Sequence, residues 1–159
     1  MEHERYSDEY LRRILTEVRT IAVVGASPRR ERPSHRVMAY LQRRGYRAIP
    51  VNPFAAGSKI NGETCHAGLA DVPEPVDMAD VFRRSAAAGE VVDAAIANRV
   101  KTIWMQLGVR DDVAADRAEA QGIKVVMNRC PAIEIPRLGL PLVCVRVDLQ
   151  SARSKRGGQ

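Results

Sequence analysis

The chain is poor in aromatic side chains and has no apolar run long enough to cross a membrane. Two Phe and one Trp are present among 159 residues, so the core must be built largely from Val, Ile, Leu and Ala. Such residues are typical of parallel strands that helices cover on both faces. A membrane helix needs about 20 consecutive apolar residues, and the first 13 residues are too charged for a signal peptide. We therefore expect a cytoplasmic protein without a membrane partner.

Cysteine is also scarce. Cys65, Cys130 and Cys144 are odd in number and widely spaced, which argues against a disulfide framework and against a CxxC metal site. Cys65 and His66 stand together without the further ligands that a tetrahedral zinc site requires. We expect reduced thiols and no metal.

Positive charge exceeds negative charge. The net charge is +6, which suits nucleic acid, an anionic membrane or a phosphorylated ligand. One cluster of three arginines lies at positions 29–32, and another three basic residues lie in the tail 150–159, whose composition predicts disorder. The basic helix face or interleaved aromatic residues of a nucleic-acid protein are missing, so nucleic acid is disfavoured.

Strand and helix patterns alternate along the chain. Helical spacing and capping residues predict helices, and apolar runs predict buried strands between them. This order predicts an α/β fold, a Rossmann-like three-layer sandwich with a mostly parallel sheet in a single domain. Residues 1–19 are expected to pack as a helix on a domain of residues 20–149, and a strand at 141–149 is left open. The expected helices are 8–19, 34–45, 85–100 and 111–122, and the expected strands are 20–27, 46–53, 76–82, 101–109 and 123–128.

The segment after the first strand, Gly25–Ser34, is where a ligand is expected, because open parallel sheets bind ligands outside the carboxyl ends of their strands. Gly25 lets a phosphate approach the backbone. The helix expected to start at Ser34, its N-cap, directs unpaired N–H groups toward the same place. Ser27 and Ser34 can donate hydroxyl hydrogen bonds, and arginines such as Arg30 can pair with phosphate oxygens. Glycine after a strand and serine at an N-cap also occur for structural reasons alone, so the loop leaves both readings open.

The loop departs from a dinucleotide fingerprint. The GxGxxG pattern is absent, since Ala26 and Ser27 follow Gly25. The second strand ends at Asn52 and Pro53, where an NAD site would have an acidic residue for the ribose hydroxyls. NAD is therefore disfavoured, whereas NADP stays open because the arginines can hold its extra phosphate.

No catalytic set emerges from the spacing of the polar residues. His3 is expected in a disordered N-terminal tail, and His35 on the first turn of the helix that follows the loop. Asp77 and Asp80 bracket the third strand. Asp80 could point into the ligand crevice or pair with an arginine, and we favour the pairing. The sequence favours a binding protein over an enzyme, and the oligomeric state stays open, with a homodimer through the first helix as one arrangement.

An ordered set of motifs resembles a known family. The motifs are AVVGAS with a downstream PS, YLQRRGYRAIPVNP, a G-x-x-I-x-G stretch at 57–62, VDMADVFR, IWMQLG and VMNRCP. Together they run from Thr20 to Pro136, and in this order they are similar to small stand-alone CoA-binding proteins related to the nucleotide-binding domain of the succinyl-CoA synthetase α subunit. The resemblance implies binding of CoA or an acyl-CoA without catalysis, in a carrier, sensor or regulatory role. The alternative is an NADP- or acyl-CoA-dependent enzyme.

The resemblance also implies how coenzyme A would lie. Its pyrophosphate is expected at the first loop, its adenosine phosphate after the second strand, its adenine after the third, and its pantetheine arm at the ends of the fourth and fifth. The residues concerned are, in that order, Gly25, Ala26, Ser27 and Ser34, with Arg30 beside them; Asn52, Pro53 and Lys59; Phe82 and Arg83; and Gln106, Gly108, Asn128, Arg129 and Cys130.

Cys130 would then meet the reactive end of CoA. One hypothesis is a mixed disulfide with the CoA thiol, with the Cys130 thiolate favoured by Arg129 or by a helix N-terminus. The other is an inert buried cysteine.

Overall fold

The computed structural model describes residues 1–143. The expected tail at 150–159, Cys144 and most of the uncertain strand at 141–149 lie outside the described residues.

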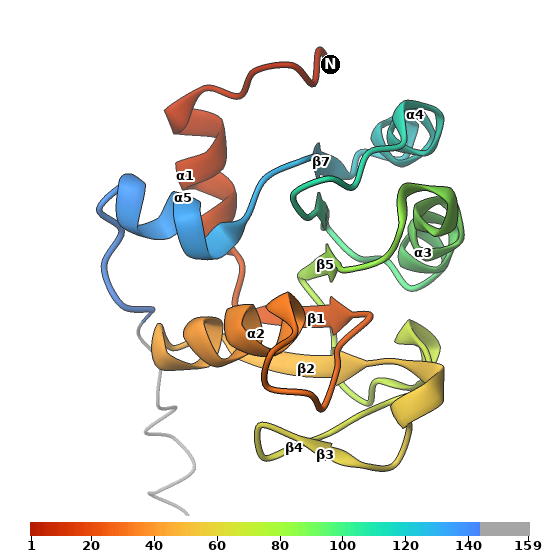
Figure 1. The fold of residues 1–159 in the computed structure, drawn as a ribbon. Coiled ribbons are helices and arrows are strands. Elements are labelled where there is room, and N and C mark those ends of the chain that lie inside the picture. Colours follow the sequence, from red (N-terminus) through yellow and green to blue (C-terminus); the bar gives the residue numbers. More distant parts are fainter. Residues whose placement is uncertain (144–159) are drawn as a thin grey trace, which may run out of the picture.

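Five parallel strands form the central sheet (Figure 1). Its order is β2-β1-β5-β6-β7, so the chain moves from β1 to one edge and then returns across β1 to build the other side. The direction of strand order therefore reverses between β1 and β5, which is the place where open sheets form a ligand crevice. The strands are β1 (Thr20–Val24), β2 (Arg47–Val51), β5 (Met78–Val81), β6 (Thr102–Met105) and β7 (Lys124–Val126).

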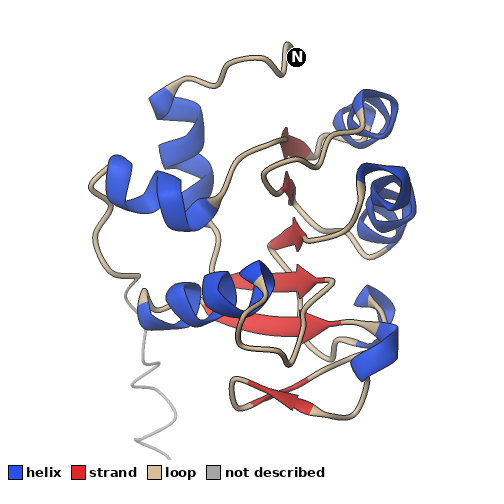
Figure 2. Ribbon diagram, in the orientation of Figure 1, coloured by secondary structure: helices blue, strands red, loops and turns tan. Residues whose placement is uncertain are grey.

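Helices cover both faces of the sheet, which confirms the expected Rossmann-like α/β fold (Figure 2). Alternation along the strands divides the core in two: Ile21 and Val23 face one cluster of buried side chains, and Ala22 and Val24 face the other. One face carries α1 (Asp8–Glu17), α2 (Pro33–Arg43) and α5 (Pro131–Arg137), and the other carries α3 (Ser85–Ala97) and α4 (Asp112–Ala120).

The first residues of α1 and α2 show which side chains cap these helices. In α1, the Ser7 hydroxyl caps the helix by accepting a hydrogen bond from the Tyr10 N–H. In α2, the N-cap is Arg32 and Pro33 is the first helical residue. The expectation that Ser34 is the N-cap is therefore wrong, because proline suits the first turn, where no N–H is needed. Ser34 lies inside that turn and is buried.

Two features were not predicted. A small hairpin joins β3 (Lys59–Ile60) to β4 (Glu63–Thr64). Its two-residue turn is Asn61-Gly62, and both residues have positive φ, the combination that a tight hairpin of this kind requires. The second feature is α5, which begins at Pro131 and contains Pro136. Short 3-10 turns also occur at Pro53–Ala55 (η1) and Leu69–Asp71 (η2).

The residues before α1 are packed against the sheet edge. His3 is buried, and its ring nitrogens lie 2.7 Å from the Tyr6 hydroxyl and 2.5 Å from a Glu119 carboxylate oxygen. The Tyr6 hydroxyl accepts a hydrogen bond from the Met127 N–H at 2.8 Å. The expectation of a disordered His3 is wrong, because these contacts attach the segment to α4 and to the end of β7.

Within residues 1–143, no helix is both long and apolar enough to span a bilayer.

Candidate functional site

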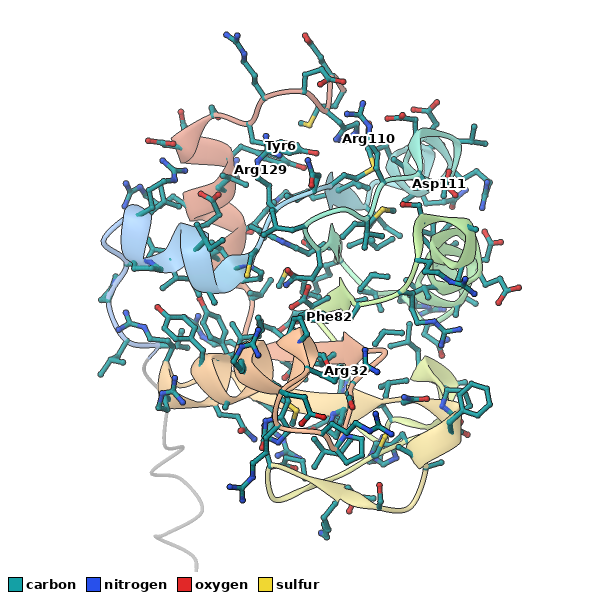
Figure 3. All side chains as sticks on the ribbon, in the orientation of Figure 1. Tyr6, Arg32, Phe82, Arg110, Asp111 and Arg129 are labelled. Carbon is teal, nitrogen blue, oxygen red and sulfur yellow. The ribbon has the colours of Figure 1, made fainter. Side chains whose placement is uncertain are left out.

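A cleft of about 720 Å³ opens at the carboxyl ends of β1, β5 and β6, where the strand order reverses. The loop after β1, the first turn of α2 and the ends of the neighbouring strands form its walls. Arg32 and Phe82 lie at this edge of the sheet in Figure 3. The lining residues are Gly25, Ser27, Arg32, Pro33, Ser34, Arg36, Val37, Phe82, Gln106, Leu107, Val109 and Cys130.

Gly25 makes the turn that opens the cleft. Its φ is +88°, and a Cβ at this position would overlap the Phe82 carbonyl oxygen. Its N–H donates to the Val51 carbonyl at 2.8 Å. The next residue, Ala26, accepts a hydrogen bond at its carbonyl from the Asn52 side chain at 2.8 Å. The loop is therefore fixed to the end of β2, and only glycine fits beside the Phe82 carbonyl at its first position.

The outer end of the cleft offers unused hydrogen-bond donors. The N–H groups of Ser27 and Ser34 find no acceptor among residues 1–143. Ser34 is 4 % exposed, and its hydroxyl also lacks a hydrogen-bond partner in this part of the chain. Arg32 and Arg36 are exposed beside them, and Arg36 is oriented by a 2.8 Å hydrogen bond to the Glu31 carbonyl. Free N–H groups at a helix N-terminus with two guanidinium groups are suited to phosphate oxygens.

The inner end of the cleft rests on a buried carboxyl group. Asp80 is fully buried, and Gln106 Nε2 donates to its two carboxylate oxygens at 3.1 and 3.2 Å. Burial raises the pKa of Asp80 to about 8, although the Gln106 hydrogen bond acts in the opposite direction. No ion pair to Asp80 is found within residues 1–143, so the expected pairing with an arginine is wrong. Alternation along β5 turns Asp80 into the core beneath α2 and α5, between Val23 and Trp104 of the adjacent strands.

Cys130 lines the same end of the cleft. It is 7 % exposed and occupies the N-cap position of α5. Burial raises the pKa of its thiol, and the nearby Asp80 adds to this effect, while the backbone at Ala132 and the Gln106 side chain oppose it. The net direction is opposite to the expected stabilisation of the thiolate.

Trp104, in β6, makes a hydrogen bond to the backbone next to Cys130. Its side chain is fully buried, and its Nε1–H donates to the Arg129 carbonyl, directly before Cys130, at 2.9 Å. The Arg129 guanidinium itself lies over the Tyr6 ring, 5.2 Å from the ring centre, and donates to the Glu4 carbonyl (Figure 3). It therefore contacts the N-terminal segment and is not a lining residue of the cleft.

The other predicted site residues are distributed around this edge. Arg30 is exposed and outside the cleft lining. Pro53 and Arg83 line a separate pocket of about 190 Å³, and Lys59 lines one of about 280 Å³ near the hairpin. Gly108 and Asn128 join two turns through a 2.8 Å hydrogen bond from the Gly108 N–H to Asn128 Oδ1. Their roles toward a ligand stay predictions.

Sequence reasoning missed much of the α2 wall. Pro33, Arg36 and Val37 line the cleft, and α2 begins at Pro33, one residue before the expected start. Helical spacing gave the available signal, since positions 33, 36 and 37 lie on one side of a helix that starts at 33. Leu107 and Val109 were also missed.

Residues 19–136 match the protein family described as CoA binding domain. The chain belongs to this CoA-binding domain family. The match confirms the resemblance drawn from the ordered motifs. In its described part, the domain has no cluster of three or more His, Cys, Asp or Glu residues that could hold a metal ion.

Relatives of this CoA-binding domain are similar over most of their length. An uncharacterized protein of Bacillus subtilis (strain 168), YneT, is 32 % identical over 120 residues, which cover 76 % of this chain and 87 % of that protein. A solved structure described as cell-free ID.343 from Thermus thermophilus is 40 % identical, with a TM-score of 0.80 and coverage of 84 % of this chain and 99 % of that one.

A larger enzyme contains a similar fold. The dinucleotide-forming acetyl-coenzyme A synthetase 1 of Ca. Korarchaeum cryptofilum is 24 % identical, with a TM-score of 0.60 over 70 % of this chain. The likeness covers 26 % of that enzyme's chain and shows a shared fold.

Proposed function

We propose that the protein binds coenzyme A, or an acyl-CoA, in the cleft between β1, β5 and α2, as a non-catalytic or regulatory CoA-binding protein. The observation that carries this proposal is the Ser34 position. Ser34 lines a cleft that two arginines border, and its hydroxyl and N–H have no hydrogen-bond partner among residues 1–143, in a chain that belongs to a CoA-binding family. Unpaired polar groups of this kind are costly unless a ligand or water supplies their partners.

The polarity of the cleft matches that of the ligand. CoA carries its phosphates on the nucleotide and a long neutral arm that ends in a thiol. The cleft is lined by Arg32 and by free donors at Ser27 and Ser34, and also by apolar side chains such as Val37 and Val109. We therefore place the phosphates at the start of α2 and the arm toward Gln106 and Cys130.

The alternative is an enzyme that uses NADP or an acyl-CoA. One observation favours it: the raised pKa of Asp80, beneath the cleft, is typical of groups that transfer protons. Asp80 is not a lining residue of the cleft, however, and its carboxylate is held by Gln106. A role for Asp80 in holding Gln106 accounts for the same contacts without a reaction.

Isothermal titration with CoA, NADPH and NADH tests this proposal. We expect CoA to bind and NADH to give no heat. Arg32→Ala should weaken CoA binding roughly tenfold, because a charged hydrogen bond to a phosphate contributes about 1.5 kcal/mol. Arg29→Ala is the matched control, since Arg29 is exposed in the same loop but outside the cleft lining. Ser27→Glu should abolish binding by charge repulsion while the circular dichroism stays native.

The opposite results are equally informative. NADPH binding without CoA binding would contradict the proposed function and favour the NADP-dependent enzyme. Equal losses in the Arg29 and Arg32 variants would mean that general positive charge, rather than the cleft, attracts the ligand.

A further inference from the structure

The inner end of the cleft presents a thiol and an amide oxygen. Gln106 is 6 % exposed, and its Nε2 is engaged by both oxygens of Asp80. Its Oε1 accepts no hydrogen bond from residues 1–143 and is therefore open to a donor on a ligand in the cleft. Cys130 lines the same cleft, and the Gln106 side chain lowers the pKa of the Cys130 thiol. Both side chains therefore meet whatever part of a ligand reaches this end.

The two ends of the cleft fix the direction of a ligand that has phosphates at one end and sulfur at the other. Arg32, Arg36 and the unpartnered hydroxyl of Ser34 hold anions at the outer end. Cys130 follows β7, which β5 and β6 separate from β1 and from the loop that carries Arg32. A molecule held by its phosphates would therefore present its sulfur to the sulfur of Cys130. This step rests on the proposed function.

We propose that Cys130 takes up CoA covalently by thiol–disulfide exchange with a CoA-containing disulfide, leaving a Cys130–CoA mixed disulfide in the cleft. Sγ of Cys130 releases its proton and attacks the CoA sulfur of the disulfide. A new Sγ–S bond forms, the old S–S bond breaks, and the departing thiolate takes up the released proton. One disulfide is consumed and one is formed, so no further oxidant or reductant takes part.

Burial makes this exchange selective. Cys130 is 7 % exposed, so disulfides that diffuse in solution rarely reach its thiol. Its raised pKa slows exchange with every disulfide alike. A disulfide held by its phosphates is instead kept beside the thiol at a high effective concentration. Cys65 offers the contrast: it is 1 % exposed, lies outside the cleft, and points its thiol toward the Asn52 carbonyl at 3.7 Å.

The test compares two disulfides on the full chain. Reduced protein is incubated with CoA disulfide or with glutathione disulfide, and adducts are followed by intact-mass spectrometry and peptide mapping without reductant. We expect one CoA per chain, attached at Cys130 and released by dithiothreitol. Its formation should be at least about tenfold faster than that of the glutathione adduct, because glutathione lacks the phosphates that anchor the ligand.

Cysteine variants locate the reaction. Cys130→Ser should lose the CoA adduct, whereas Cys65→Ser and Cys144→Ser should keep it. Titration of Cys130→Ser with reduced CoA shows whether its cleft is intact. An adduct at another cysteine, or equal rates with the two disulfides, would overturn the inference.

The failure of the inference and of the proposed function have different signatures. If reduced CoA binds by calorimetry and no adduct forms at Cys130, the exchange is refuted and the binding site stands. If neither CoA nor its disulfide binds, the proposed function fails as well.

Discussion

At the scale of single residues, Asp80 stands out because a carboxyl group occupies a position that the strand pattern gives to the core. Neighbouring positions on β5 are apolar, and the Asp80 side chain has Gln106 as its hydrogen-bonding partner. Burial of a charged carboxylate is unfavourable. In the folded protein it therefore raises the pKa of Asp80 far above the ordinary aspartate value, to about 8.

This proton predicts how stability depends on pH. Between the ordinary aspartate pKa of about 4 and the folded value of about 8, the folded state binds one more proton than the unfolded state. The free energy of unfolding should therefore fall as pH rises through this window, by up to about 1.4 kcal/mol per pH unit, and level off above it. Asp80→Asn retains an oxygen that accepts from Gln106 and should remove this slope. Urea denaturation from pH 5 to pH 8.5 measures the free energy of unfolding of the unmodified protein and of Asp80→Asn. Equal pH slopes for the two would contradict the raised pKa of Asp80.

Gly25 gives a second prediction at this scale. In Gly25→Ala, the new Cβ meets the Phe82 carbonyl and the backbone must keep φ near +88°. We expect a loss of about 3 kcal/mol or more in the free energy of unfolding, since strain and overlap add. Gly57→Ala is the control, because Gly57 has φ +85° with no atom within 4 Å of the added Cβ. It should lose only about 1 kcal/mol. Similar losses in the two variants would show that overlap with Phe82 is unimportant.

At the scale of elements, the N-terminal segment is attached to the end of β7. The Tyr6 hydroxyl accepts a hydrogen bond from the Met127 N–H and contacts His3, and the Tyr6 ring lies beneath the Arg129 guanidinium. Arg129 adjoins Cys130, so the segment supports the strand end that forms the inner wall of the cleft.

Tyr6→Phe isolates the contribution of the hydroxyl. It keeps the ring beneath Arg129 but leaves the buried Met127 N–H without an acceptor, which should lower the free energy of unfolding by about 1–2 kcal/mol. Tyr40→Phe is a matched control, since Arg43 lies over that ring at 5.9 Å in the same way. Thermal denaturation that places the two variants at the same midpoint would refute the role of the hydroxyl.

Elements differ in how far their sequence predicts them. The strands and α1 to α4 follow from apolar periodicity, and Ser7 and Asp111, residue types that favour N-caps, cap α1 and α4 in the structure. The seven-residue α5 does not, because two prolines in so short a segment indicate a loop unless tertiary packing supports them. Ile135 provides that packing by burying itself beneath α1 and α2.

At the scale of the whole molecule, the position of the cleft could be predicted and its lining only in part. Strand alternation gives a parallel sheet, and a parallel sheet gathers the ends of β1, β5 and β6 at one edge. The side chains that face the cleft cannot be predicted from the apolar periodicity of the sequence. Arg36 lies on the wall of the cleft. The partner of Asp80 is Gln106, which directly follows β6 and is 26 positions away. Tertiary packing decides both.

The placement of the single tryptophan has a practical consequence. Trp104 is the one indole in the chain, and its N–H is bound to the carbonyl that precedes Cys130. Its fluorescence should therefore report on the floor of the cleft without any attached dye. Emission would shift to longer wavelength on unfolding and would change in intensity, with little spectral shift, when the pantetheine arm arrives. One optical signal can thus follow both folding and ligand occupancy in the same cuvette.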